Sequence, residues 1–203
     1  MKKLFIALSL LVLSLAAAPQ SELDRAAAAT AGMEADFTHS FKPKGFTRPQ
    51  NEHGAVIFGK LPAMRWTYTS PESKTFVFDG AQSWFYVPSD KQVIVTTITD
   101  QTRSELPFLA LGDAATREKY FTISEQGHGA TNMVSLTQKR PVSLIHTVNI
   151  ETDAVTHRIN SIDYTDRDGN KTVFVFSKYR PAKIDGGTFT FAAPQGVQVV
   201  RGD

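Results

Sequence analysis

Apolar and polar residues alternate with a period of two along most of this chain, which predicts short β-strands with one buried face. The densest such stretch covers residues 64–87 and holds three apolar runs joined by turns. Asp79-Gly80 begins the second turn, and Asp-Gly between β-forming residues is a strong hairpin signal because tight turns need positive φ angles. Both tryptophans, Trp66 and Trp84, lie in this stretch. We interpret it as the wall of a site that holds an apolar ligand.

Similar strand patterns, separated by turn residues, occur on both sides of this stretch. Together they predict roughly eleven or twelve short strands in a single domain, 19–203, with helical pieces at only two places. This pattern is typical of an antiparallel barrel or a strongly curved sheet. The further strands are expected at 33–41, 53–58, 92–99, 120–125, 132–139, 143–150, 155–164, 172–178, 188–191 and 197–200.

Two helical regions interrupt the strands. Ser21 is a suitable cap for a first helix that Gly32 would end. The second region is a very apolar helix over 104–112, followed by a further turn that Asp113 would cap. Two interpretations of the apolar helix remain open: it plugs the end of the barrel, or it is a movable lid over a cavity lined by Trp66, Trp84 and neighbouring phenylalanines.

The first 18 residues have the pattern of a secretory signal peptide. Lys2 and Lys3 precede an apolar run over 4–15, and the small residues Ala16, Ala17 and Ala18 follow it. The cleavage site is expected between 16 and 18. A membrane-spanning anchor would need about 20 apolar residues, which is longer than this run.

Composition narrows the possible functions. The chain has 22 basic and 20 acidic side chains, and the two lysines of the leader account for the difference. The balanced charge of the remainder gives no support for nucleic-acid binding, which needs a basic face. The chain has no cysteine, so disulfides and a lipidated N-terminal cysteine are excluded.

Sequence signatures of catalysis are absent. The five histidines are scattered without the HExxH spacing of a zinc site, and the chain has no GxSxG motif and no phosphate-binding glycine loop. We therefore expect a protein that is not an enzyme and that needs neither a metal nor another cofactor.

Several segments, in order and over nearly the whole mature chain, resemble the LolA-type periplasmic carriers of outer-membrane lipoproteins. Each segment is weakly specific alone, but the set behind a signal peptide is fairly specific. The matching residues are Phe37 and Phe41, Pro62-Ala63-Met64-Arg65-Trp66, Phe78-Asp79-Gly80, Trp84-Phe85-Tyr86, Gln92, Leu106-Pro107-Phe108-Leu109, Phe189-Thr190-Phe191 and Pro194-Gln195-Gly196-Val197.

The resemblance implies a mainly β fold, an incomplete, half-open antiparallel barrel of about 11 strands closed by short helices that include an α lid. It also implies a monomeric periplasmic carrier that shields the acyl chains of lipoproteins. Its cargo would come from an inner-membrane ABC transporter and pass to an outer-membrane acceptor. The candidate lipid-binding residues are Phe37, Met64, Trp66, Phe76, Phe78, Trp84, Leu106, Phe108 and Leu109.

One position departs from the family pattern. Members of the family commonly have an arginine before the proline that is Pro62 here, and that arginine helps to latch the closed lid; this chain has Leu61. Either Lys60 or Arg65 replaces it, or apolar contacts alone hold the lid. We predict weaker latching and slower cargo release than in relatives that have the arginine. Two rival functions stay open: a carrier of another exported lipid or glycolipid, and a sensor that recognises apolar anchors without moving them.

Overall fold

The structure is a computed structural model that describes residues 20–99, 102, 112, 114–140 and 145–202. The expected signal peptide and the expected lid residues Leu106, Phe108 and Leu109 lie outside the described residues. In the part that is described, no helix is both long enough and apolar enough to cross a bilayer.

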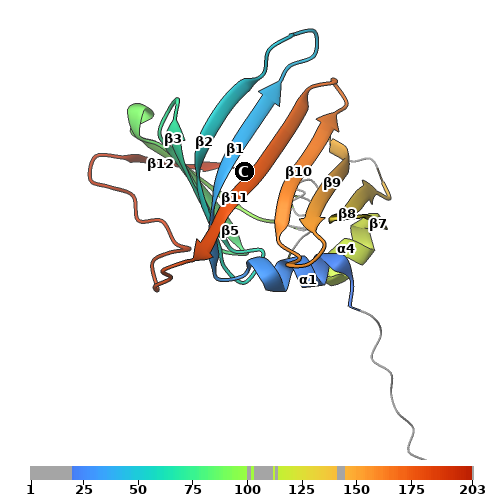
Figure 1. Cartoon of the computed structure of the whole chain (residues 1–203). Helices are drawn as coiled ribbons and strands as arrows, with labels where there is room; N and C mark the ends of the chain where they lie inside the picture. Colours follow the sequence, from blue (N-terminus) through green and yellow to red (C-terminus); the bar gives the residue numbers. More distant parts are fainter. Residues whose placement is uncertain (1–19, 100–101, 103–111, 113, 141–144, 203) are drawn as a thin grey trace, which may run out of the picture.

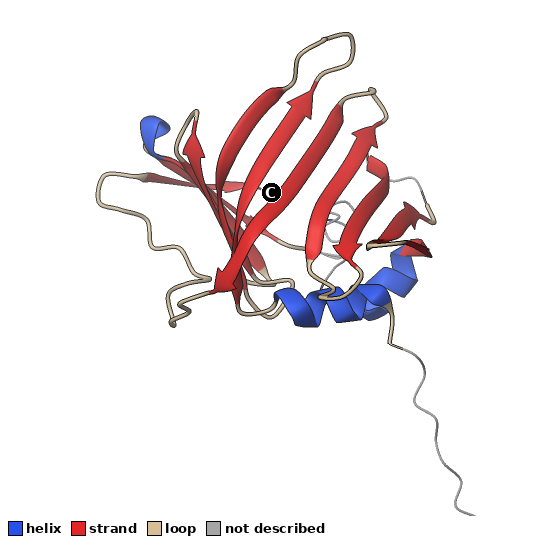
Figure 2. Cartoon of the chain, in the orientation of Figure 1, coloured by secondary structure: helices blue, strands red, loops and turns tan. Residues whose placement is uncertain are grey.

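The described chain forms one twelve-stranded sheet with short helices beside it, as Figure 2 shows. The helices are α1 (Glu22–Thr30), the 3-10 turn η1 (Pro88–Asp90) and α4 (Ala114–Tyr120). The strands are β1 (Met33–Lys42), β2 (Gln50–Phe58), β3 (Met64–Ser70), β4 (Lys74–Phe78), β5 (Gln82–Val87), β6 (Gln92–Thr97), β7 (Phe121–His128), β8 (Thr131–Gln138), β9 (Ile145–Asp153), β10 (Ile159–Asp166), β11 (Lys171–Pro181) and β12 (Gln198–Gly202).

The sheet is curved but does not close. Its strand order is β12-β6-β5-β4-β3-β2-β1-β11-β10-β9-β8-β7, so β12 and β7 are its two edges. Neighbouring strands are antiparallel, except that β12 pairs parallel with β6. The prediction of a half-open antiparallel barrel is confirmed, with twelve strands instead of about eleven.

One predicted strand was wrong in part and another was wrong throughout, and in both places an aspartate makes a turn. Val155 was expected in a strand, but β10 begins only at Ile159, because the Asp153 carboxylate accepts hydrogen bonds from the backbone N–H groups of Val155 and Thr156 at 3.0 and 2.7 Å. Val155 is 86% exposed as a result. Short polar side chains that bond to the backbone two or three residues on favour turns over strands.

The predicted strand at 188–191 is also a turn and an irregular segment. The Asp185 carboxylate accepts hydrogen bonds from the Gly187 N–H and the Thr188 hydroxyl, both at 2.9 Å. The Phe191 ring packs 5.1 Å from the ring of Tyr86, which the register places on the face of the sheet opposite Trp66. The segment after β11 therefore crosses that outer face before β12 joins β6.

Helix α1 follows its sequence signals and lies at the lower end of the sheet in Figure 1. The Ser21 hydroxyl accepts a hydrogen bond from the Asp24 N–H at 3.2 Å, as an N-cap does. Leu23 and Ala26 are buried in the main core. Gly32 has φ +76°, a left-handed conformation that lets the chain turn sharply into β1.

Gly54 on β2 makes close ring packing possible on the concave face. A Cβ at this position would lie 2.1 Å from the Thr67 carbonyl oxygen and 2.9 Å from the Phe37 ring. We expect Gly54→Ala to lower the free energy of unfolding by about 1–3 kcal/mol, because backbone and ring would both have to move. Urea unfolding would measure the change. Gly127→Ala on β7 is the matched control, since its Cβ would meet only Asn132 Oδ1 at 3.6 Å; equal losses in both variants would contradict this explanation.

Candidate functional site

Aromatic rings crowd the concave face of the sheet. We call Phe37, Phe58, Trp66, Phe174 and Phe176 the aromatic wall; all five are at most 6% exposed. The ring centroids of Phe37 and Trp66 are 5.0 Å apart at an interplanar angle of 69°, an edge-to-face contact of the favourable kind. The aromatic wall is thus a continuous layer of buried rings at the centre of the half-barrel.

Curvature brings together rings from strands that are not neighbours. Trp66 on β3 and Phe174 on β11 are separated by three strand-to-strand steps, about 14 Å in a flat sheet. Their ring centroids are 5.4 Å apart. The concave face therefore folds toward itself, and a ligand there would contact strands from both halves of the sheet.

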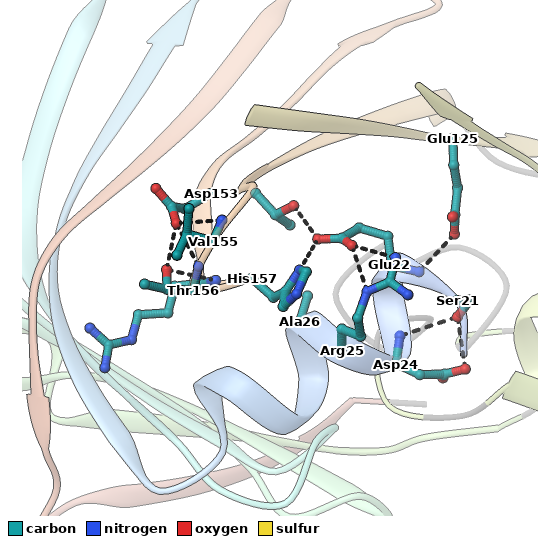
Figure 3. A network of polar contacts seen from close by, with 12 residues as sticks. Ser21, Glu22, Asp24, Arg25, Ala26, Glu125, Asp153, Val155, Thr156 and His157 are labelled. Atoms are coloured by element: carbon teal, nitrogen blue, oxygen red, sulfur yellow. Dashed lines mark hydrogen bonds and ion pairs between the residues drawn. The ribbon is translucent and has the colours of Figure 1, made fainter. Parts of the chain in front are cut away.

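A buried carboxylate fixes α1 at the lower end, as Figure 3 shows. Glu22 is 1% exposed, and its Oε1 accepts hydrogen bonds from Thr152 Oγ1 at 2.5 Å and His157 Nδ1 at 3.0 Å. Its Oε2 accepts one from Arg25 Nε at 2.9 Å. Burial would raise the carboxyl pKa, but these hydrogen bonds, together with one from Asn132, outweigh burial and hold the pKa below its ordinary value.

Helix α1 is also tied to the edge of the same half of the sheet, which ends at β7. The Glu22 backbone N–H donates to Glu125 Oε1 on β7 at 3.1 Å. Asp24 forms an ion pair with Arg117 of α4, whose side chain is only 3% exposed. Helix α1 therefore links β7, α4 and the turn between β9 and β10 below the concave face.

Polar side chains gather at the other end of the concave face, away from α1. We call His39, Glu52, Tyr68 and Lys74 the polar cluster. Glu52 joins two of them, since His39 Nδ1 lies 2.9 Å from its Oε2 and Lys74 Nζ lies 2.6 Å from its Oε1. Burial lowers the pKa of His39 although Glu52 opposes the shift. Burial, followed by the charge of Glu52, raises the pKa of Tyr68.

The structure brings most of the expected lining residues to one face. Phe37, Met64, Trp66 and Phe78 are buried in the main core, and Phe76 packs against it. Directly opposite residues of an antiparallel pair point to the same face of a sheet. Because Trp66 lies opposite Phe76 and Met64 lies opposite Phe78, these residues share the concave face. That these residues bind lipid stays a prediction.

Trp84 does not share that face. It pairs with Val77 and Val95, whereas Trp66 pairs with Phe76, so Trp84 lies on the outer face. We therefore remove it from the proposed lining. The sequence could not show this, because three consecutive aromatic residues, Trp84, Phe85 and Tyr86, fit either assignment.

The expected latch residues are dispersed. Leu61 is 6% exposed and belongs to the main core, while Lys60 is exposed. Arg65 lies on the outer face, where its guanidinium donates to the carbonyl oxygens of Thr188 and Thr190 at 3.3 and 3.5 Å. Arg65 thus contacts the segment after β11. Slower cargo release stays a prediction, because the expected lid lies outside the described residues.

Sequence reasoning missed Phe58, Phe174, Phe176 and the polar cluster as parts of the site. The alternation around Phe174 and Phe176 did predict a strand. Only the pairing of β11 with β1 places these rings beside Phe37, across more than 130 residues of sequence. No local sequence pattern predicts a contact between residues so far apart in the chain.

These features define a half-open β-barrel whose apolar concave face is its candidate binding surface. The family model described as "Outer membrane lipoprotein carrier protein LolA" matches residues 28–192. The chain therefore belongs to the LolA family of outer-membrane lipoprotein carrier proteins.

Individual relatives agree with this assignment. The chain is 32% identical to an outer-membrane lipoprotein carrier protein of Vibrio campbellii and 30% identical to one of Aliivibrio fischeri, in each case over 98% of both chains. A crystal structure of an uncharacterized conserved protein from Thermus thermophilus has a similar fold, with a TM-score of 0.56 at 11% identity, covering 89% of this chain and 96% of that one.

Proposed function

We propose that this protein carries outer-membrane lipoproteins across the periplasm by holding their acyl chains against the aromatic wall. The observation that carries the proposal is the continuous layer of rings on the concave face of a fold from the lipoprotein-carrier family. A carrier of this kind binds its cargo without chemical change.

Physical chemistry explains why such a surface is needed. An acyl chain of about 15 methylene groups gains about 12 kcal/mol on leaving water, at about 0.8 kcal/mol for each group. Free acylated protein would therefore not cross an aqueous compartment at a useful rate. We further propose that a monomer receives cargo from an inner-membrane ABC transporter and passes it to an outer-membrane acceptor.

Photocrosslinking at two neighbouring positions tests where the acyl chains bind. We expect a photoreactive phenylalanine in place of Phe76 to crosslink to lipoprotein with labelled acyl chains, because Phe76 faces the aromatic wall. The same group in place of Trp84, on the adjacent strand but the outer face, is the matched control. Equal labelling at the two positions would argue against the concave face as the binding surface.

The identity of the cargo separates the proposed function from its rivals. Mass spectrometry of protein purified gently from its native periplasm should find lipoproteins, and depletion in cells should leave lipoproteins at the inner membrane. A free lipid or glycolipid as the bound species would indicate a different carrier. Normal lipoprotein sorting with only a changed stress response would indicate a sensor.

A further inference from the structure

The side chains on the concave face change from apolar to polar along the axis of the half-barrel. Leu23 and Ala26 of α1 are buried at its lower end, and the aromatic wall occupies its centre. The polar cluster lies beside the β1–β2 and β3–β4 turns, near the upper end in Figure 1. A ligand with an apolar tail and a polar end would match this gradient in one orientation only.

Strand register places the polar cluster on the concave face. His39 pairs with Glu52 and is two residues from Phe37, while Lys74 pairs with Tyr68, two residues from Trp66. Because side chains alternate between faces with a period of two, all four members point to the side of the aromatic wall. The side chains of His39, Glu52 and Lys74 are 19%, 21% and 21% exposed, so water reaches them but does not surround them.

Ring contacts and hydrogen bonds hold the cluster in place. The imidazole of His39 stacks on Phe174 with a centroid separation of 4.3 Å and an interplanar angle of 6°. The Lys74 ammonium lies 4.5 Å from the centre of the Tyr68 ring, within cation–π range. Such fixed geometry suits a recognition site, because little side-chain entropy is lost when a ligand binds.

Hydrogen-bonding capacity remains for a ligand. The Tyr68 hydroxyl has no hydrogen-bond partner among the residues that the structure describes. The Lys74 ammonium has three N–H donors, and Glu52 uses one of them. The Tyr68 hydroxyl can donate or accept a hydrogen bond, whereas the Lys74 ammonium can only donate, so a ligand that binds both groups must offer an acceptor.

The net charge of the cluster favours a neutral acceptor. The opposite charges of Lys74 and Glu52 cancel. Burial lowers the pKa of His39 and so favours its uncharged imidazole. A phosphate would meet the Glu52 carboxylate without a surplus cation, whereas a carbonyl oxygen needs only the available donors. The linkage between an acyl chain and a glycerol is an ester, which offers such an oxygen next to the apolar tail.

We propose that the polar cluster binds the ester carbonyls of an acylated cargo through Tyr68 and Lys74 and so directs the acyl chains along the aromatic wall toward α1. This inference rests on the proposed function, since it assumes that acyl chains bind the concave face. It adds a polar site that fixes the orientation of the cargo. A cluster that served only as a cross-strand ion pair would have no influence on ligand choice.

Two lipopeptides that differ only in this linkage test the inference. A diacylglyceryl-cysteine peptide carries ester carbonyls, and its dialkyl ether analogue has equal chains without them. With purified full-length mature protein, displacement of a fluorescent fatty acid should show at least tenfold tighter binding of the ester, the range expected for hydrogen bonds that include a charged donor. Tight but equal binding of the two probes would overturn the inference and leave the proposed function standing; binding of neither would count against both.

Matched tyrosine variants assign the effect to the cluster. Tyr68→Phe removes only the hydroxyl and keeps the ring contacts with Phe37 and Lys74. It should reduce the preference for the ester about fivefold and leave affinity for the ether unchanged. Tyr86→Phe makes the same chemical change on the outer face and should alter neither affinity. An unchanged preference in Tyr68→Phe would overturn the role of the hydroxyl.

A double variant tests the lysine without leaving Glu52 as an unpaired charge. Glu52→Gln with Lys74→Met keeps a hydrogen-bond acceptor for His39. This double variant should lose most of the preference for the ester lipopeptide over the ether analogue. Folding of the double variant would be checked by near-UV circular dichroism.

A comparison of dioctanoyl phosphatidic acid with dioctanoylglycerol tests whether the cluster binds a phosphate instead. Tighter binding of the phosphatidic acid, lost in the double variant, would show that the polar cluster recognises a phosphate and would overturn the proposal.

Discussion

Replacing Glu22 with alanine is expected to lower the free energy of unfolding by about 3–5 kcal/mol, the usual cost of removing one partner from a buried charge network. The change would leave His157 and Thr152 without the carboxylate that they share, and Arg25 without its ion-pair partner. Because Glu22 ties α1 to the turn between β9 and β10, the lower end of the half-barrel would loosen first. Urea unfolding followed by tryptophan fluorescence would measure the loss.

Glu118→Ala on α4 is the matched control, since Glu118 is an exposed glutamate. We expect it to change stability by no more than about 0.5 kcal/mol. A loss for Glu22→Ala as small as that of the control would mean that the network contributes little to the fold.

The pH dependence of the free energy of unfolding provides a second test of the Glu22 carboxylate. The pKa of Glu22 is lowered in the folded state from an ordinary value of 4.5. The folded state thus binds a proton less readily than the unfolded chain, so ionised Glu22 stabilises the fold above about pH 4.5 and this contribution is lost as the pH falls through the lower folded-state pKa. The stability difference between the natural protein and Glu22→Gln should therefore shrink below that pH. A constant difference from pH 7 to pH 3 would contradict this.

Trp66→Ala is the second large effect that we expect, with a loss of about 3–5 kcal/mol in the free energy of unfolding. The Trp66 ring is 4% exposed and contacts four rings of the concave face, those of Phe37, Phe58, Phe174 and Phe176. Its removal would leave a cavity that rings held by β11 and β1 could fill only in part. Chemical denaturation at a fixed temperature would measure the loss.

Trp84→Ala removes the other tryptophan and is the natural comparison. Trp84 is only half-buried and lies on the outer face, so its loss should cost less than about 2 kcal/mol. The two variants should also differ in cargo binding, which we expect to weaken for Trp66→Ala alone. Equal effects of the two substitutions on both properties would show that the two faces of the sheet are not functionally distinct.

Local chemistry was enough to predict many of the elements. Ser21 caps α1, and Asp79-Gly80 lies in the turn between β4 and β5, as their residue types indicated. Period-two alternation found most strands, because one buried face imposes that spacing whatever the partner strand is. It failed where aspartate side chains formed turns, at Asp153 and Asp185, since those hydrogen bonds replace strand pairing.

The sequence by itself thus determined a cysteine-free, mainly β chain whose strands each have one apolar side, and its motifs indicated the family. Only the tertiary structure decided that Trp66 faces the concave side while Trp84 faces outward, that β12 runs parallel to β6, and that Phe174 lies beside Phe37. It also decided that Glu22 would be buried under the sheet and that His39, Glu52, Tyr68 and Lys74 would meet. The physical reason is that propensity and alternation act over a few residues, whereas pairing and burial depend on contacts between residues far apart in the chain.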